Sequence, residues 1–389
     1  MRLLTYSTLY PNAAQPNHGV FVENRLRHLI ASGKVESRVV APVPWFPSAG
    51  AGFGRYASYA AAPKREERNG LPVEHPRYPV MPKIGMSAAP GLLYRFSRPA
   101  LERQRRDGYD FQLIDAHYFY PDGVAAVLLG RYFDRPVVIT ARGTDLNLIP
   151  DYALPRRMIL WAASRAAGVV AVCQALKDRL VALGADAGRI TVLRNGVDLA
   201  LFQPVDRTAA RQALGLRRRT LLSVGGLIPR KGNDIVVQAL PALPDVELLL
   251  VGEGPERDAL ARLAASLGVA DRVRFLGAVA HADLPRIYSA ADALVLASSR
   301  EGWANVLLEA MACGTPVIAS DVWGTPEVVA ARAAGVLMPS RTPAGLSTAF
   351  NDLFADLPSR SATRAYAARF DWDATTSGQL ALFGEILGR

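Results

Sequence analysis

The sequence predicts an α/β protein made of two tandem domains, each with a parallel sheet covered by helices. Three observations support this prediction. Short apolar runs typical of strands alternate with longer runs of helical periodicity through most of the chain. The 389 residues are enough for two domains of ordinary size. Half of the residues are hydrophobic, so each domain can bury a substantial core.

The first series of alternating elements occupies residues 1–195. Strands are expected at 2–6, 38–43, 111–117, 136–141, 168–172 and 190–193, and helices at 20–32, 152–166 and 174–183, with another opening at Pro121. The loop after the first strand lacks the G-x-G-x-x-G spacing, so the dinucleotide-binding fingerprint is absent. Residues 44–70 are rich in Gly, Pro, Ser and Ala and predict a long, mobile loop.

A second series follows a connector at 199–219. Strands are expected at 220–224, 246–251, 273–276, 293–297 and 316–319, and helices at 233–241, 255–267, 282–290, 305–313 and 326–331. The two series indicate two Rossmann-like, doubly wound domains that face a cleft, residues 1–195 and 196–371. We expect a last helix, within 372–389, to cross back to the N-terminal domain. Ligands of such sheets bind beyond the carboxyl ends of the strands.

Positive charge is concentrated in the first half of the chain. Residues 1–195 hold 26 Lys and Arg against 15 Asp and Glu, a net charge of +11, whereas residues 196–389 have a net charge of −1. This excess predicts an anionic partner: a membrane surface, a pyrophosphate-linked substrate or nucleic acid. Nucleic acid is disfavoured, because no known motif appears and the aromatic residues are not interleaved with the basic ones.

The segment at 81–106 combines an apolar first part with a strongly basic second part. Such a segment can lie on an anionic membrane surface, and the alternative is a surface helix with a solvated basic face. The N-terminus lacks the apolar core of a signal peptide, and no run of 18 apolar residues suggests a membrane span. We expect a cytoplasmic protein in peripheral contact with the inner face of the membrane, with Cys173 and Cys313 as buried free thiols.

Residues 301–320 form the most informative run of the chain. The run predicts a loop with Glu301, a helix with Asn305 as its N-cap and Glu309 inside it, and then a buried strand. The free amides of a helix N-terminus favour an anion. Flanked by the two carboxylates, this anion site suits a ligand that has both phosphates and sugar hydroxyls. The alternative interpretation is an ordinary strand–helix unit with two solvated glutamates.

Glycine-rich loops follow the other strands of the second series. In residues 225–232, Gly226 permits close approach of a ligand to the backbone, and Arg230 and Lys231 fit a pyrophosphate clamp; the alternative is a basic surface turn. Gly277 follows the next-but-one strand, where the backbone could meet a flat base. The loop at 252–255 favours a structural role. The convergence of these loops on one edge of the sheet strengthens the functional interpretation.

These motifs resemble the donor-binding domain of the family 4 retaining glycosyltransferases, which have the GT-B fold. The resemblance rests on GGLIPRKG (225–232), VGEGPER (251–257), EGWANVLLEAMACGTPVIAS (301–320), GTPEVV (324–329) and RNGVD (194–198). The N-terminal half matches more loosely, through HGVFVENRL (18–26), DAH (115–117) and TARGTDL (140–146).

The resemblance implies a role for each matching residue of the second half. Arg230 and Lys231 would hold the donor diphosphate and neutralise the leaving group. Glu309 would bind the ribose hydroxyls, and Glu301 would bind hydroxyls of the transferred sugar. The backbone amides would receive phosphate oxygens at Ala304, Asn305 and Val306.

In the first half, the resemblance implies that Gly19 lets its loop approach the phosphates and that His117 faces the sugar near the reacting centre. The family often has a His-Gly pair where this chain has Arg142 and Gly143. We therefore place Arg142 on the acceptor side, where it could bind an anionic acceptor or a phosphate. Asp145 matches a frequent acidic position in the same loop.

The resemblance also implies the reaction. A sugar would pass with retention from a nucleotide-diphosphate sugar to an acceptor. The Arg-rich N-terminal domain favours a lipid-linked or polysaccharide acceptor, in cell-envelope or exopolysaccharide synthesis. No protein nucleophile, cofactor or metal is expected. Asp371 and Asp373 form a D-x-D pair, but their position at the start of the last helix favours a helix N-terminus over a metal site. The alternative function is a nucleotide-sugar epimerase on the same plan of two domains.

Overall fold

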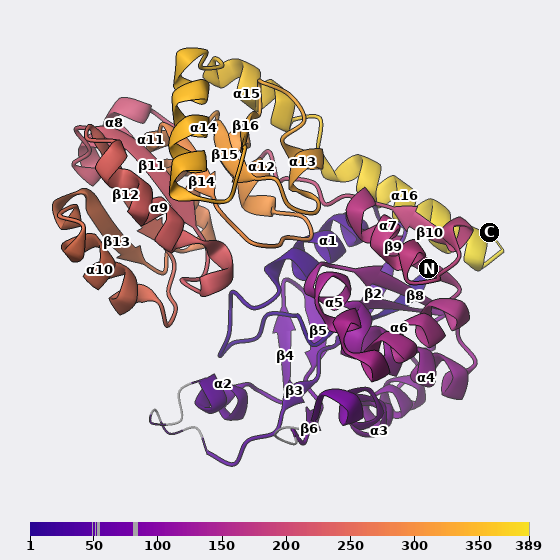
Figure 1. Ribbon diagram of the computed structural model, residues 1–389. Coiled ribbons are helices and arrows are strands. Elements are labelled where there is room, and N and C mark those ends of the chain that lie inside the picture. The colour runs from indigo at the N-terminus through magenta and orange to yellow at the C-terminus, as the bar shows by residue number, and fades with distance from the viewer. Residues whose placement is uncertain (49, 51, 53–54, 81–84, 389) are drawn as a thin grey trace. The chain divides into compact units, whose positions relative to one another are not determined.

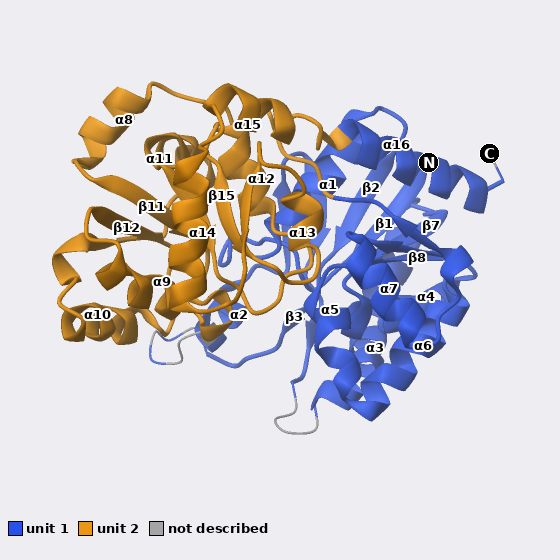
Figure 2. Cartoon of the chain, turned by 45° about the horizontal axis from the view of Figure 1, so that its top comes forward, with its two compact units in different colours: residues 1–194, 373–389 blue, residues 195–372 orange. Residues whose placement is uncertain are grey.

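The computed structural model describes residues 1–48, 50, 52, 55–80 and 85–388. The chain divides into two compact units, shown in Figure 2. Unit 1 comprises residues 1–194 together with 373–389, and unit 2 comprises residues 195–372. Each unit has its own sheet, with helices on its faces (Figure 1).

Within the described residues, unit 1 has an eight-stranded sheet of order β10-β9-β8-β7-β1-β2-β5-β4. Its strands are β1 (Arg2–Tyr6), β2 (Glu36–Val40), β4 (Arg65–Arg68), β5 (Leu71–Glu74), β7 (Leu113–His117), β8 (Val137–Ala141), β9 (Gly168–Ala171) and β10 (Ile190–Val192). All pair in parallel except β4, which runs antiparallel to β5. The short strands β3 (Val43–Pro44) and β6 (Arg77–Tyr78) pair separately.

The helices of unit 1 bury the apolar central strands on both faces. They are α1 (Val20–Ala31), α2 (Arg55–Ala61), α3 (Gly85–Arg106), α4 (Val124–Phe133), α5 (Thr144–Asn147), α6 (Ala153–Arg165), α7 (Gln174–Ala182) and α16 (Trp372–Ile386). Phe383 of α16 packs in one core cluster with Leu3, Leu113 and Val170 of the sheet.

Two expectations about the first half were wrong. The expected strand at 38–43 is divided into β2 and β3. The expected mobile loop at 44–70 contains α2 and β4, although residues 49, 51, 53 and 54 lie outside the described residues. Strand β4 escaped the pattern search because it is charged along its length and depends on pairing with β5 at the sheet edge.

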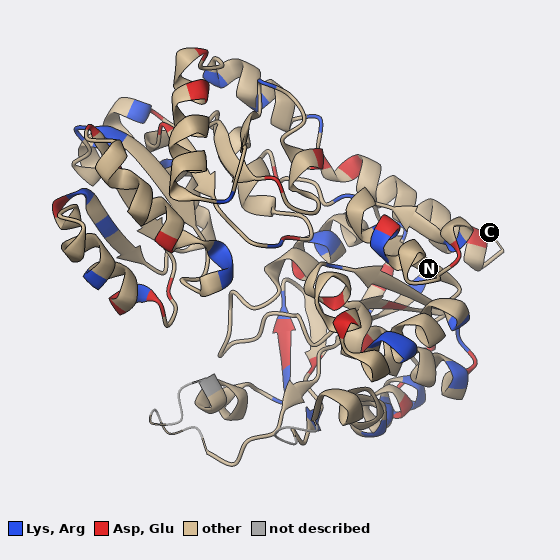
Figure 3. Ribbon diagram, in the orientation of Figure 1, with Lys and Arg blue, Asp and Glu red and all other residues tan. Residues whose placement is uncertain are grey.

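The segment at 81–106 forms α3 from Gly85 onward, and residues 81–84 lie outside the described residues. One face of α3 is buried, with Leu93 and Leu101 inside, and the helix packs against α4. Figure 3 shows Lys and Arg along α3. The helix is therefore amphipathic, and its apolar face is largely used inside unit 1.

The described part of unit 2 has a six-stranded parallel sheet of order β13-β12-β11-β14-β15-β16. Its strands are β11 (Arg219–Val224), β12 (Val246–Val251), β13 (Val273–Gly277), β14 (Ala293–Leu296), β15 (Val317–Ser320) and β16 (Gly335–Met338). From β11 the sheet continues through β12 to β13 on one side, and from β14 it continues through β15 to β16 on the other side. The topological switch point therefore lies between β11 and β14, where such sheets bind ligands.

The helices of unit 2 are α8 (Arg207–Leu214), α9 (Asn233–Ala239), α10 (Arg257–Ser266), α11 (Leu284–Ala290), α12 (Asn305–Ala312), α13 (Thr325–Val328), α14 (Pro343–Ala355) and α15 (Arg360–Ala367). The sequence prediction omitted β16, α14 and α15, and it took α8 for part of the connector. Asp206 caps α8 by accepting a hydrogen bond from the Ala209 amide at 3.0 Å, a signal that the sequence contains.

None of the helices built from described residues is long and apolar enough to cross a membrane.

Candidate active site

The loops after β11 and β14 meet at the switch point of unit 2. Gly232 has a φ of +67°, and a Cβ there would lie 2.1 Å from the carbonyl oxygen of Ala297. The Ser299 amide also donates to the Arg230 carbonyl at 2.8 Å. Glycine at position 232 therefore lets the two loops come close enough for their side chains to interact.

Lys231, Arg230 and Glu301 form the centre of this site. One carboxylate oxygen of Glu301 accepts hydrogen bonds from Lys231 Nζ at 2.7 Å, Arg230 Nη1 at 3.2 Å and Ser298 Oγ at 2.7 Å. Burial raises the pKa of Glu301, but the charges of Lys231 and Arg230 and the hydrogen bonds outweigh burial and lower the pKa. The carboxylate is thus ionised at neutral pH and holds both cations at the carboxyl edge of the sheet.

Glu309 is positioned by side chains that the sequence prediction did not single out. Tyr288 Oη donates to Glu309 Oε2 at 2.8 Å, and His281 Nε2 lies 3.5 Å from Glu309 Oε1. The ring of Phe202 packs against the rings of both Tyr288 and His281. The hydrogen bond to Glu309 raises the pKa of His281. No local pattern pointed to Tyr288, because it belongs to a different helix, α11.

Helix α12 starts between the two glutamates. Its N-cap is Ala304 and not Asn305, which was the expected cap; the side chain of Asn305 accepts a hydrogen bond from Asn195 instead. The side chain of Ala304 makes no capping hydrogen bond, so the amides of Asn305 and Val306 receive no cap from the N-cap residue. At the other end, Gly314 has a φ of +78°, as expected for the residue after a helix C-terminus.

The glycine loops around this site are of two kinds. A Cβ at Gly252 would lie 2.0 Å from the Gly225 carbonyl oxygen, and one at Gly254 would lie 2.3 Å from the Leu227 oxygen, so these two glycines permit tight loop packing. Gly226 and Gly277 have open space instead. Apart from the glycine itself and its two chain neighbours, no atom of the described residues lies within 4 Å of a Cβ built at Gly277, and the closest to Gly226 is 3.8 Å away.

The sequence-predicted residues of unit 1 gather at the carboxyl ends of β7 and β8. Arg142 Nη2 donates to His117 Nδ1 at 2.6 Å, so the imidazole proton lies on Nε2, which is 3.2 Å from Asp115 Oδ2. Burial lowers the pKa of His117 to about 4, although Asp115 opposes the shift. His117 is 1% exposed and is neutral at physiological pH.

The remaining predicted residues of unit 1 have clear structural functions. Asp145 is buried and accepts hydrogen bonds from the amides of Phe119, Arg142 and Gly143, which hold the loop after β8. Gly19 has a φ of +72°, and a Cβ there would lie 2.3 Å from the carbonyl carbon of Leu9. Gly19 thus permits its loop to pack on the chain after β1.

A buried network behind His117 was also missed. Gln379 of α16 donates to Asp115 at 3.2 Å and accepts a hydrogen bond from Arg25 of α1 at 3.0 Å. All three side chains are buried. Their separation in the chain leaves no local signal that could have linked them.

Two doubly wound α/β units, one of them with a glycine-rich and basic switch point, define a protein of the GT-B class. Residues 206–370 match the model of the group 1 glycosyl transferases, and residues 20–201 match the model of glycosyltransferase family 4. The chain therefore belongs to the group 1 glycosyltransferases of family 4.

Relatives and solved structures agree with this assignment. The chain is 40% identical over 308 residues to the D-inositol 3-phosphate glycosyltransferase of Mycolicibacterium gilvum, an alignment that covers 74% of this chain and 68% of that protein. The enzyme of the same name from Mycolicibacterium vanbaalenii is 32% identical over 317 residues, with 74% and 69% covered.

Among solved structures, sucrose-phosphate synthase from Thermosynechococcus elongatus has a TM-score of 0.81 at 22% identity, with 100% of this chain and 99% of that chain covered. Anabaena HepE in complex with UDP-glucose has a TM-score of 0.74 at 22% identity, with 99% of each chain covered. These likenesses show the GT-B fold.

Proposed function

We propose that the protein transfers a sugar from a nucleotide-diphosphate sugar to an acceptor, with retention of the anomeric configuration and without a metal ion. The observation that carries this proposal is the pairing of Lys231 and Arg230 with Glu301 at the switch point of unit 2. Because the solved structure of HepE contains UDP-glucose, UDP-glucose is the first donor to test.

Each donor group has a partner in this proposal. Lys231, Arg230 and the amides at the start of α12 bind the diphosphate and neutralise it as it leaves. Glu309, held by Tyr288, binds the ribose hydroxyls, and Glu301 binds hydroxyls of the transferred sugar. The open backbone at Gly226 and Gly277 lets the nucleotide approach closely.

Catalysis then consists of positioning and charge stabilisation. The departing phosphate accepts the proton of the attacking hydroxyl, so that no protein nucleophile is required. By family resemblance, His117 lies on the side of the transferred sugar near the reacting centre, and Arg142 and Asp145 belong to the acceptor side. The described residues contain no group of three or more His, Cys, Asp and Glu that could hold a metal ion.

For the acceptor, we propose a lipid-linked or polysaccharide chain of cell-envelope or exopolysaccharide synthesis. The net charge of +11 in residues 1–195 favours an anionic acceptor and peripheral contact of α3 with the inner face of the membrane. A second candidate is an inositol phosphate, because the relatives from Mycolicibacterium are named for that substrate. The family and its relatives are glycosyltransferases, so the epimerase alternative has no support.

A donor screen tests the proposal. UDP, GDP and ADP sugars are each added to the purified protein, and we expect one nucleotide series to raise the melting temperature. With that donor, the product should keep the anomeric configuration by NMR, and EDTA should leave turnover unchanged. Isomerised donor in the absence of any acceptor would point to an epimerase instead.

The clamp is tested with Lys231→Ala. We expect transfer to fall by at least a hundredfold while the melting temperature without ligand changes little, because the side chain acts on the ligand's charge. Arg262→Ala, an exposed cation on α10, serves as the control and should retain activity. Near-normal turnover in Lys231→Ala would refute the assignment.

A further inference from the structure

A pocket of about 720 Å³ lies in unit 1, away from the residues assigned above. It is bounded by the residue after β3, the start of β4, the end of β5 and one side of α3. Trp45 and Phe96 line it together with Lys64, Arg65, Arg77 and Arg103. Such a mixture of flat apolar surface and positive charge has no function within the donor site.

The pocket lies at the functional edge of the sheet. Glu74 lines it and is the last residue of β5. Strands β5, β2, β1 and β7 are successive neighbours and all run in parallel, so the carboxyl ends of β5 and β7 lie on the same edge. Three strand spacings separate Glu74 from His117, which places them roughly 14 Å apart.

Trp45 and Phe96 provide apolar faces that are open to solvent. Trp45 is 56% exposed and Phe96 is 41% exposed. The backbone of Trp45 is fixed, because its amide donates to the Tyr78 carbonyl at 2.7 Å. Aromatic side chains exposed in a concave site are suited to bind sugar rings. The apolar face of a sugar ring can cover the aromatic ring while the sugar hydroxyls stay hydrated.

The charged side chains of the pocket are not balanced. Glu74 accepts hydrogen bonds from Arg103 at 2.5 Å and from Arg65 at 3.3 Å, and it is the acidic residue of the described lining. Arg77 donates only to neutral carbonyls among the described residues, those of Tyr59 and Ala62. The Lys64 side chain has no hydrogen-bond or ion-pair partner among the described residues, and only its backbone carbonyl accepts a hydrogen bond, from the His75 amide at 2.9 Å. The local excess of positive charge therefore favours an anionic ligand.

We propose that this pocket binds a saccharide that carries an anionic group, a uronate or a sugar phosphate, in a part of the acceptor beyond the sugar that reacts. Only the identification of the saccharide as part of the acceptor rests on the proposed glycosyl transfer, because binding itself needs no reaction. The hollow shape favours a chain molecule over a lipid surface, because a membrane plane contacts protruding side chains and leaves a concave pocket unfilled.

The test measures direct binding to the full chain. Oligogalacturonate is the anionic probe, a neutral gluco-oligosaccharide of equal length is its control, and a phosphorylated oligosaccharide distinguishes the two anionic groups. We expect the neutral probe to bind at least tenfold more weakly than one of the anionic probes. Equal binding of neutral and anionic probes would overturn the assignment of the charge.

Variants locate the binding. Trp45→Ala and Lys64→Glu should each weaken binding of the anionic probe at least tenfold. Tyr152→Ala, which removes an aromatic side chain that is also about half exposed but lies outside the pocket, should not. Unchanged affinity in both pocket variants would overturn the proposal. Trp45-dependent binding to phosphatidylglycerol vesicles, with no binding of either anionic oligosaccharide, would also overturn it.

Lys231→Ala separates this inference from the proposed function. Because Lys231 belongs to the donor clamp, the variant should bind the anionic oligosaccharide as the unmodified protein does. A protein that binds the oligosaccharide but transfers no sugar from any donor would refute the proposed function and leave this pocket assigned. In the opposite case, the protein transfers sugar but the pocket variants bind the probes with unchanged affinity. That result would refute the pocket assignment alone.

Discussion

Tyr288 shows how a single hydroxyl prepares the site that we propose for the donor. Its side chain is buried, and this burial raises the pKa of Tyr288 well above the usual value. The negative charge of Glu309 is the second cause of the increase. The phenol therefore remains a hydrogen-bond donor at every physiological pH. It holds Glu309 Oε2 in one orientation, in which the carboxylate faces the ribose in our proposal.

We predict that Tyr288→Phe raises the KM for the donor about tenfold with little change in kcat. The reason is that a hydrogen bond to a charged group contributes roughly 1.5–3 kcal/mol, and its loss frees the carboxylate to rotate. The preference for a ribonucleotide over a 2′-deoxyribonucleotide donor should also fall. Steady-state kinetics with both donors measures the two effects.

Tyr132→Phe provides the matched control, because Tyr132 also donates to a glutamate, Glu102, but on the surface of unit 1. Its kinetics should equal those of the unmodified protein. An unchanged donor KM in Tyr288→Phe would show that Glu309 does not need this support.

At the scale of residues, local chemistry made part of the site predictable. Arg230, Lys231, Glu301 and Glu309 lie in strand-end loops and at a helix start, where cations, carboxylates and free amides have a recognisable use. Tyr288 had no such context. Its role depends on α11 packing beside α12, which the sequence around Tyr288 does not encode.

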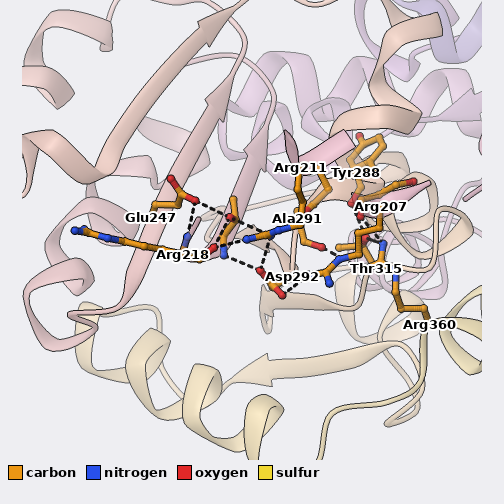
Figure 4. Close-up of polar contacts among 12 residues, drawn as sticks. Arg207, Arg211, Arg218, Glu247, Tyr288, Ala291, Asp292, Thr315 and Arg360 are labelled. Carbon is orange, nitrogen blue, oxygen red and sulfur yellow. Dashed lines mark hydrogen bonds and ion pairs between the residues drawn. The ribbon is translucent and has the colours of Figure 1, made fainter. Parts of the chain in front are cut away.

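At the scale of elements, arginines of unit 2 tie helix ends to strands (Figure 4). Arg207 and Arg211 of α8 bind the carboxylate of Asp292, which precedes β14. Arg360, the first residue of α15, donates to the carbonyls of Ser289, Ala291 and Cys313 and to the hydroxyl of Thr315. It thereby joins the C-terminal ends of α11 and α12.

We predict that Arg360→Ala lowers the free energy of unfolding of unit 2 by roughly 2–3 kcal/mol, because it removes charged hydrogen bonds and leaves buried carbonyls without donors. Burial, reinforced by the charge of Arg207, lowers the pKa of Arg360 to about 10, so the group is still charged at pH 7. Urea denaturation at that pH measures the effect.

Arg286→Ala is the control for this variant, since Arg286 is exposed on α11. It should change the free energy of unfolding by less than about 0.5 kcal/mol. Equal stability of the two variants would mean that the hydrogen bonds of Arg360 make no net contribution to the free energy of unfolding.

The prediction of helices and strands from the sequence succeeded where the hydrophobic pattern was strong. The buried strands β7, β8, β11, β12 and β14 stand out as apolar runs, and their helices follow with the expected period. It failed for β4, which is charged and depends on its neighbour, and for α8, where a basic surface resembled a connector. In both cases the stabilising partner lies outside the element.

At the scale of the whole molecule, the chain returns to unit 1 after completing unit 2. Helix α16 places Phe383 in the core cluster with Leu3, Leu113 and Val170, and Phe383 is 0% exposed. The same helix carries Gln379, which joins Arg25 to Asp115 behind His117. The C-terminal segment therefore completes the core of the unit that holds the histidine.

We predict that Phe383→Ala destabilises unit 1 by about 3–5 kcal/mol, the usual cost of the cavity left by a buried phenylalanine. Glu385→Ala, exposed on the same helix, should have little effect. Thermal unfolding followed by hydrogen exchange assigns the loss to unit 1. Loss of protection confined to unit 2 would contradict the prediction.

The sequence by itself determined the α/β class and the tandem series, and it pointed to the residues from Arg230 to Glu309 that we propose for the donor. Hydrophobic period, glycine loops and helix starts are local properties of the chain. Only the tertiary structure decided which carboxylate oxygen Lys231 and Arg230 share, how Tyr288 holds Glu309, and how Gln379 reaches Asp115. It also decided that Trp45, Lys64 and Phe96 line one pocket. These contacts join residues far apart in sequence, and their geometry arises from packing rather than from any local pattern.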